Sequence, residues 1–315
     1  MTPRAAFALL LALLIAPASP LASDATAAAP AVAAARLRVV ATTTDLQSLV
    51  EAVGGERVAV THIVSPNQDP EDYQPRPQDL HRIKEAALVV RIGVDYDLWL
   101  DRLLAQADIP ALKRGGERYV DASLAIALLD VRGSAVGPGH PHGSGNPHYW
   151  LDPSNAEIIT GTLLEALARI DAANARYYER RRIAFLDRLK LRQQVWTQAL
   201  ASLQGVPLIA YHNNWAYFAR RFRLNFAGYI EAKPGVPPSP AHLAQLLAAM
   251  RTQGIRIIVR QPHEPEKNAR FLAERAGGQV VTLAASVGAV AGTGDYLSLF
   301  DHNVAALARG YSGSP

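Results

Sequence analysis

The sequence contains no cysteine among its 315 residues. Disulfide bonds, thiolate metal sites and cysteine nucleophiles are therefore excluded, and any metal site must be built from histidine nitrogens and oxygen atoms. The sequence also lacks a Gly-x-Ser-x-Gly elbow, a phosphate-binding glycine loop and a His-Glu-x-x-His pair, which are signatures of common enzyme classes. We therefore expect a binding protein rather than an enzyme.

Positive charge is present but is not gathered into one block. The net charge is +4, and charged residues make up 19% of the chain. The arginines are spread along predicted helices without a nucleic-acid recognition motif, so nucleic acid is not an expected partner. Hydrophobic residues make up 49% of the chain, which is typical of a globular protein. The length is sufficient for two domains, each with its own core.

The N-terminal apolar run, residues 5–16, is shorter than the ~20 residues of a membrane-spanning helix. Arg4 precedes the run, and prolines and small residues follow it, which is the layout of a secretory signal peptide over residues 1–23. Because no cysteine follows the run, a lipid anchor on a mature N-terminal cysteine is excluded. Residues 24–36 are rich in alanine and are predicted to form a disordered lead-in. We expect the mature protein to work in the periplasm.

Predicted strands alternate with predicted helices in two parts of the chain. Residues 37–152 form the first part, which ends in a glycine- and histidine-containing loop at 133–146, and residues 205–310 repeat the layout. Strands and helices that alternate in this way form parallel βαβ units. The sequence therefore predicts an α/β fold with two similar lobes, each a parallel sheet flanked by helices.

The segment 153–204 is predicted to link the lobes. Apolar residues recur at helical spacing along it, and no glycine or proline interrupts the sequence between Thr162 and Gln204. A break is predicted near residues 171–174, followed by a long second helix. Such a helix would join the lobes as a rigid strut.

Histidines stand where a ligand of this fold would bind. In open α/β sheets, ligands bind in the crevice beyond the carboxyl ends of the strands. His212 directly follows a predicted strand, and His148 stands at the matching place before the strut. Neutral imidazole is a preferred ligand of zinc and other divalent transition metals. Glu71 lies in an acidic loop after the second strand and is predicted to add an oxygen ligand.

Each of these residues also has a plainer interpretation. A single histidine at a strand end often has a structural role, and Glu71 could belong to a solvated acidic turn. His140 and His142 lie in the glycine-rich loop, where they would either capture metal transiently or have no function. His263 follows a strand as well, but it could simply precede a helix.

Six motifs together resemble the metal-specific substrate-binding proteins of ABC importers, the zinc- and manganese-uptake group, and the resemblance covers residues 37–309. The motifs are Asp69–Pro77, Val94–Trp99, Asn146–Pro153, Tyr211-His212, Pro238-Ser239-Pro240 and Asp295–Phe300. The resemblance implies two lobes joined by a rigid helix, with one divalent metal held between them by three histidines and a carboxylate.

The resemblance also implies a ligand set, although two of its four positions differ here. The second and third family histidines fall on His148 and His212, whereas the first falls on Glu71. The expected carboxylate falls near Ala285, which cannot coordinate a metal. A carboxylate in place of a histidine makes manganese or iron more acceptable, with zinc remaining the first expectation. The candidates for the fourth ligand are Glu231 and His263.

The expected function is that of a monomeric periplasmic receptor that captures a divalent metal, zinc before manganese, and delivers it to the membrane permease of an ABC transporter. Three alternatives remain open. The protein could bind a metal chelate or another small solute with the same fold, or it could be a divergent relative that has lost metal binding. It could also be a secreted metallohydrolase that uses His148, His212 and Glu71 with an activated water.

Overall fold

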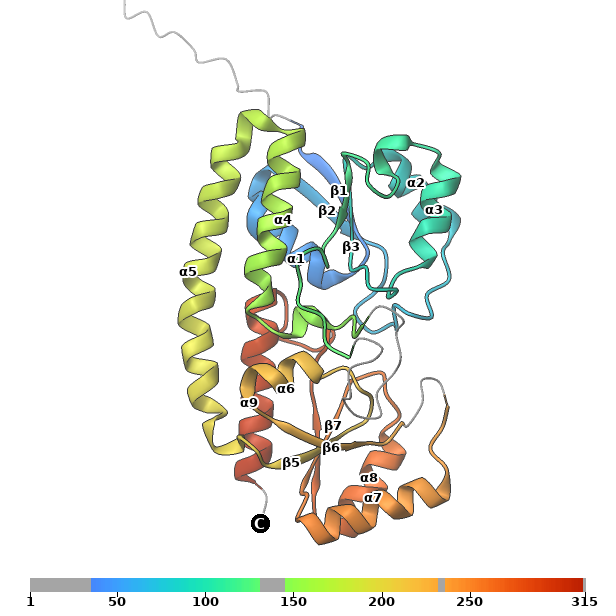
Figure 1. Cartoon of the computed structure of the whole chain (residues 1–315), viewed down its shortest axis with the longest axis vertical. Helices are drawn as coiled ribbons and strands as arrows, with labels where there is room; N and C mark the ends of the chain where they lie inside the picture. The colour runs from blue at the N-terminus through green and yellow to red at the C-terminus, as the bar shows by residue number, and fades with distance from the viewer. Residues whose placement is uncertain (1–34, 131–144, 232–235, 314–315) are drawn as a thin grey trace, which may run out of the picture. The chain divides into compact units, whose positions relative to one another are not determined.

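The structure, a computed structural model, describes residues 35–130, 145–231 and 236–313. The predicted signal peptide, most of the predicted lead-in, and His140 and His142 lie outside the described residues. The described residues contain two four-stranded sheets in which all neighbouring strands run parallel (Figure 1). This confirms the predicted α/β fold with two similar lobes. Within the described ranges, no helix combines the length and apolar character needed to cross a membrane.

The sheet of the first lobe has the strand order β2-β1-β3-β4. Its strands are β1 (Leu37–Ala41), β2 (Val58–His62), β3 (Leu88–Arg91) and β4 (Tyr119–Asp121). Successive residues of a strand point to opposite faces, and both faces of β1 are buried: Val39 belongs to one apolar cluster and Val40 to another. The helices that cover these faces are α1 (Thr44–Gly54), α2 (Pro77–Glu85) and α3 (Trp99–Ala107).

The second lobe repeats this arrangement with the strand order β6-β5-β7-β8. Its strands are β5 (Pro207–Ala210), β6 (Asn225–Tyr229), β7 (Ile257–Arg260) and β8 (Gln279–Thr282). Leu208 and Ile209 of β5 again belong to two different apolar clusters. The covering helices are α6 (Ala216–Phe222), α7 (Pro240–Gln253), α8 (Glu266–Ala276) and α9 (Tyr296–Ser312).

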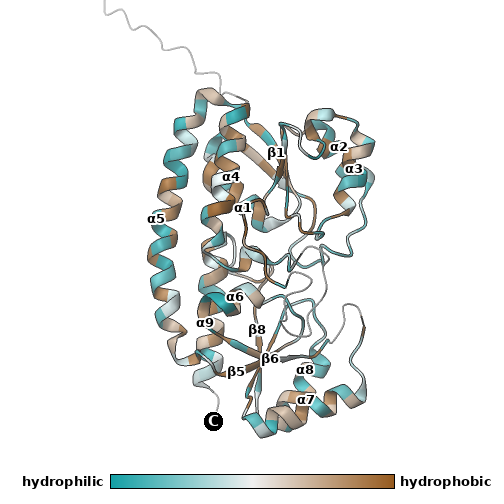
Figure 2. Ribbon diagram, viewed as in Figure 1, coloured by the Kyte–Doolittle hydropathy of each residue, from teal (hydrophilic) through white to brown (hydrophobic). Residues whose placement is uncertain are grey.

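Two helices connect the lobes, α4 (Asn155–Ile170) and the 25-residue α5 (Ala175–Ala199). The predicted break between them is a 3-10 turn at Ala172–Asn174. At 1.5 Å per residue, α5 is about 37 Å long, and it runs beside both sheets (Figure 1). Figure 2 shows hydrophilic residues alternating with hydrophobic ones along α5, and its buried residues face the lobes as one stripe: Tyr178, Phe185, Leu189 and Trp196.

The two lobes share one hydrophobic core and several buried hydrogen bonds. Residues of both sheets and of α5 and α9 belong to a single apolar cluster. The Val287 N–H donates to the Asp45 carboxylate at 2.9 Å, and the Tyr296 N–H donates to the Ser48 hydroxyl at 2.9 Å. The Trp150 indole N–H donates to the Ala285 carbonyl, also at 2.9 Å. These contacts fix the second lobe against the first.

Phe185 tests whether the inner stripe of α5 stabilises both lobes. Phe185→Ala removes a ring that is 2% exposed, so it is expected to lower the free energy of unfolding by about 3–5 kcal/mol. Ile183→Ala, on the same helix but 51% exposed, should cost less than about 1 kcal/mol. Urea denaturation followed by tryptophan fluorescence measures both, and equal losses would contradict the packing described.

Asp45 gives the contact between the lobes a pH dependence. Its burial raises its pKa to about 7, although the Val287 N–H and the Ser286 side chain favour the charged form. An unfolded aspartate has a pKa of ~3.9, so the folded state binds more protons between pH 4 and 7. The stability contributed by this group is therefore present at pH 4 and is lost as the pH rises through 7.

Asp45→Asn should remove this loss, because the amide stays neutral and its oxygen can still accept from Val287. We expect the variant to match the wild type near pH 4 and to exceed it by on the order of 2–4 kcal/mol at pH 8. Urea denaturation at pH 4, 6 and 8 measures the difference, which should grow with pH. A difference that is constant over this range would contradict the assignment.

Candidate metal centre

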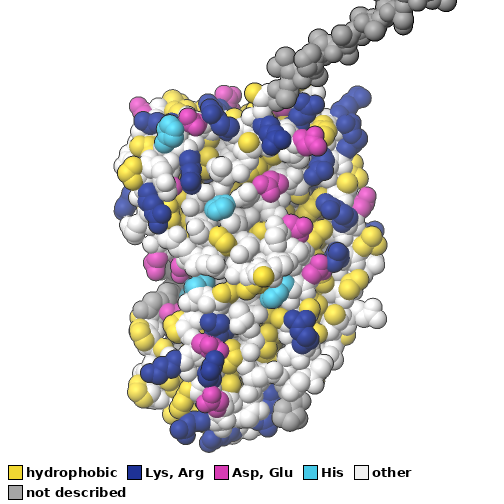
Figure 3. Space-filling view, turned by 180° about the vertical axis from the view of Figure 1, so that it is seen from behind, with side chains coloured by type: hydrophobic (Ala, Val, Ile, Leu, Met, Phe, Trp, Pro, Cys, Tyr) yellow, Lys and Arg dark blue, Asp and Glu magenta, His cyan; other side chains and the backbone are white. Residues whose placement is uncertain are grey.

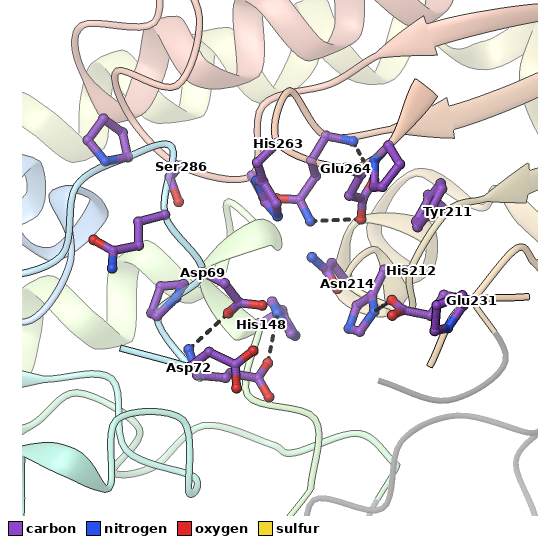
Figure 4. A pocket seen from close by; sticks show the side chains of 18 of the residues that line it. Asp69, Asp72, His148, Tyr211, His212, Asn214, Glu231, His263, Glu264 and Ser286 are labelled. Atoms are coloured by element: carbon purple, nitrogen blue, oxygen red, sulfur yellow. Dashed lines mark hydrogen bonds and ion pairs between the residues drawn. The ribbon is translucent and has the colours of Figure 1, made fainter. Parts of the chain in front are cut away.

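A cleft of about 440 Å³ lies between the lobes, where loops from both sheets meet (Figure 4). All five predicted metal-site residues within the described ranges line this one cleft: Glu71, His148, His212, Glu231 and His263. In the second lobe, each of these loops directly follows β5, β6 or β7, as the rule for open sheets requires. Ala285, at the position of the expected carboxylate, is also part of the wall.

The loop that carries Glu71 is anchored on both sides of this residue. The Trp99 indole N–H donates to the Pro70 carbonyl at 2.9 Å, and the Tyr73 hydroxyl donates to the Asp79 carboxylate at 2.7 Å. The backbone N–H of Glu71 donates to the side chain of Asp69 at 2.9 Å. These contacts hold Glu71 at the cleft wall.

His148 lies just before the 3-10 turn that precedes α4, and it is 3% exposed. Its Nδ1 is 3.1 Å from the side-chain oxygen of Asn146. The Asn146 amide nitrogen donates to Asp130 and to the Asn213 carbonyl, which fixes the oxygen toward the histidine. Because an amide oxygen only accepts, Nδ1 carries the proton. Nε2, 3.8 Å from the Glu71 carboxylate, is then the nitrogen whose lone pair is available to a ligand.

His212 is held in a similar way from the second lobe. Its Nδ1 lies 2.7 Å from the Glu231 carboxylate (Figure 4), which likewise requires a proton on Nδ1 and leaves the lone pair of Nε2 available to a ligand. Burial by itself lowers the pKa of His212, but the hydrogen bond to Glu231 and the charges of Glu264 and Glu71 outweigh it and raise this pKa above its usual value.

Two carboxyl groups of the cleft have pKa values well above the usual range of a glutamate. Burial, reinforced by the nearby Asp69, raises the pKa of Glu71 to about 7. Burial also raises the pKa of Glu264 to about 7, although the Gln261 N–H donates to it at 2.6 Å. Near neutral pH these groups are therefore partly protonated, and a cation that enters the cleft would stabilise their charged forms.

Within the part of the chain that the structure describes, no three histidine, aspartate or glutamate side chains lie close enough together to hold a metal ion. The cleft instead contains two pairs of such groups. The first half-site consists of Glu71 and His148, and the second consists of His212 and Glu231. A metal ion shared by the two half-sites requires their side chains to approach one another.

Tyr96 belongs to the motif Val94–Trp99 but was not predicted to line the cleft, where its ring lies edge-on at 5.3 Å from the ring of His148. Val94 and Asp95 before it both have positive φ angles, 51° and 62°, which are unfavourable for non-glycine residues. The Asp97 carboxylate holds this turn by accepting the Gly93 N–H at 3.1 Å.

Asn146 and Glu264, which contact or neighbour the predicted site residues, were not predicted from the sequence either. Asn146 opens the motif that contains His148 and precedes that residue by two positions, whereas no local pattern distinguishes Glu264.

Two parallel α/β lobes joined by a long helix, with imidazole and carboxylate groups in the cleft between them, define the class of metal-binding solute-binding proteins. The family described as "ZnuA: Zinc-uptake complex component A periplasmic" matches residues 39–310. The chain therefore belongs to this family of extracytoplasmic, non-enzymatic ABC-transporter components that bind metal ions. The expectation that the protein is not an enzyme is confirmed, and the metallohydrolase alternative is wrong.

The names of individual relatives mention different metals or leave the metal unspecified. A putative metal-binding protein of Treponema pallidum is 27% identical over 254 residues, covering 79% of each chain. The iron-binding protein YfeA of Yersinia pestis is 24% identical over 90% of this chain and 88% of its own. A crystal structure of a zinc-bound ZnuA deletion mutant superposes with a TM-score of 0.73 at 28% identity, covering 89% of this chain and 98% of that one.

The Glu231 contact can be tested through the protonation of His212. Glu231→Gln keeps a hydrogen-bond acceptor but removes the negative charge, so the pKa of His212 should fall by about one unit. Histidine proton resonances followed in an NMR pH titration of the metal-free protein measure the change. Glu266→Gln, on the exposed part of α8, serves as the control and should leave this pKa unchanged. An unaltered value in Glu231→Gln would contradict the role assigned to the carboxylate.

Proposed function

We propose that this protein captures one divalent metal ion in the cleft between its lobes and delivers it to the membrane permease of an ABC transporter. The observation that carries this proposal is that two histidines are positioned in the same way. His148 and His212 line the same cleft from different lobes, and an oxygen contacts Nδ1 of each. Both imidazoles are thereby prepared to bind a cation through Nε2.

Glu71, His148 and His212 are the proposed metal ligands. The buried carboxyl of Glu71, 3.8 Å from His148, would lose its proton on metal binding and supply negative charge. Zinc accepts such a combination of imidazole and carboxylate ligands in a four-coordinate shell. We propose zinc as the first choice of metal, with manganese or iron as the alternatives that the oxygen ligand permits.

Glu231 and His263 differ in how well they suit the fourth position. Glu231 already contacts Nδ1 of His212, the arrangement of a carboxylate that orients a metal-binding histidine. His263 lines the cleft from an exposed position. We therefore propose that Glu231 acts by positioning His212, and that His263 contributes at the edge of the cleft rather than as a metal ligand.

The remaining parts of the proposal concern the whole protein. We propose that residues 1–23 are a cleaved signal peptide and that the mature chain works as a periplasmic monomer. Residues 37–152 and 205–310 would form the domains joined by 153–204, and His140 and His142 would serve as accessory metal-capturing groups. On the face seen in Figure 3, basic and acidic side chains are interspersed, which supports the expectation that nucleic acid is not a partner.

A metal chelate or another small solute is a second candidate ligand. The cleft volume of about 440 Å³ lies within the range of small-molecule sites, roughly 300–1,000 Å³. A protein that binds a chelate through the organic part would retain binding when His148 and His212 are replaced, whereas a receptor for the bare ion would not.

Calorimetric titration of the metal-stripped mature protein with zinc and with manganese tests the proposal. We expect one-to-one binding by the wild type and a loss of at least 100-fold in the His148→Ala/His212→Ala double variant, because half of a four-ligand shell is removed. His81→Ala/His302→Ala, which changes two histidines outside the cleft-lining set, is the control and should bind like the wild type. Failure of the wild type to bind either ion would contradict the metal-receptor function.

A further inference from the structure

The second lobe lacks an oxygen ligand at Ala285 but contains another polar side chain that faces the cleft. Ala285 presents only a methyl group, and its carbonyl oxygen already accepts the Trp150 indole N–H at 2.9 Å. The carboxylates nearby are engaged as well: Glu231 contacts His212 at 2.7 Å, and Glu264 accepts the Gln261 N–H at 2.6 Å. The second lobe also lines the cleft with a residue whose side-chain oxygen is not engaged in a hydrogen bond.

Asn214 has the properties that such a ligand needs. It follows His212 by two residues, lines the same cleft and is 7% exposed. Its side-chain oxygen is buried and has no hydrogen-bond partner among the described residues. In Figure 4 the side chain lies in the space between His148, His212 and Glu264. A buried amide oxygen without a partner is costly, and a ligand toward which the side chain turns its oxygen would satisfy it.

The kind of ligand follows from the surroundings of this oxygen. The cleft wall bears the carboxyl groups of Asp69, Glu71, Asp72, Glu231 and Glu264, which together favour a cation over an anion. An amide oxygen is a neutral, hard donor of the type that manganese and other oxygen-preferring divalent ions accept readily. His212 and Asn214 belong to the same turn after β5, so one short segment can present a nitrogen and an oxygen together.

We infer that the side-chain oxygen of Asn214 binds the divalent cation held by Glu71, His148 and His212, in the place of a carboxylate at Ala285. This inference rests on the proposed metal-binding function. The resulting shell has two nitrogen and two oxygen donors. The oxygen from Asn214 increases the affinity for manganese more than that for zinc, because zinc depends more strongly on the two imidazoles. Asn214 is therefore a residue that determines metal preference.

The chain offers a matched control in the neighbouring Asn213. Asn213 is also 7% exposed, and its side-chain oxygen is also buried without a hydrogen-bond partner, but the residue is absent from the cleft wall. Replacing either asparagine by alanine removes the same atoms from an equally buried position. Only Asn214→Ala changes a side chain that lines the cleft.

The experiment is a competition titration of the metal-stripped full mature chain with Mn²⁺ and with Zn²⁺. Asn214→Ala is expected to weaken Mn²⁺ binding on the order of tenfold or more and Zn²⁺ binding less, so that the ratio of the two affinities shifts toward zinc. Asn213→Ala should leave this ratio unchanged. Asn214→Asp, which retains an oxygen donor and adds charge, should bind Mn²⁺ at least as tightly as the wild type.

Several results would overturn the inference, and they differ from a failure of the proposed function. If the wild type binds metal and Asn214→Ala retains the wild-type affinity ratio, the buried oxygen contacts water instead. Equal losses in Asn213→Ala and Asn214→Ala, or a loss of Mn²⁺ binding in Asn214→Asp, would indicate a structural role. If the wild type binds neither ion, the metal-receptor function itself fails, and the assignment of Asn214 fails with it.

Discussion

The buried side chain of Trp150 connects both lobes with the wall of the cleft between them. Its indole N–H donates to the Ala285 carbonyl at 2.9 Å, and its own carbonyl accepts the Tyr296 hydroxyl at 2.5 Å. Its ring lies 5.3 Å from the rings of both His148 and Tyr96. Because a close-packed interior permits little independent movement, the contacts that hold the second lobe in place also determine where His148 stands.

The same burial gives the cleft its chemical character. It raises the pKa of Glu71 and of Glu264, because a charged carboxylate is poorly solvated there. A cation reverses this penalty, so the energy of the site depends on the presence of an ion. The rigid strut α5 and the shared core limit movement between the lobes. We therefore expect the half-sites to approach one another through side chains and loops rather than through rotation of whole lobes.

Much of the fold could be predicted from the sequence, because local periodicity reports local structure. Alternating strands and helices predicted two parallel sheets, and an apolar repeat without glycine or proline predicted the long helix. The break before this helix, near residues 171–174, was predicted as well. The residues that line the cleft could also be predicted from the sequence. The carboxyl ends of parallel strands meet at one edge of a sheet, so His212 and Glu231, each directly after a strand, had to lie near each other. The motif that contains His148 placed that residue opposite them.

The sequence by itself thus determined the two-lobed architecture and the residue types that line its cleft, because periodicity and strand order suffice for both. Only the tertiary structure decided which nitrogen of each histidine has its lone pair available to a ligand, since this depends on Asn146 and Glu231 as hydrogen-bond partners. It also decided that Asn214 faces the cleft while Asn213 does not. Such distinctions arise from side-chain orientation and from contacts between distant segments, which no local sequence pattern records.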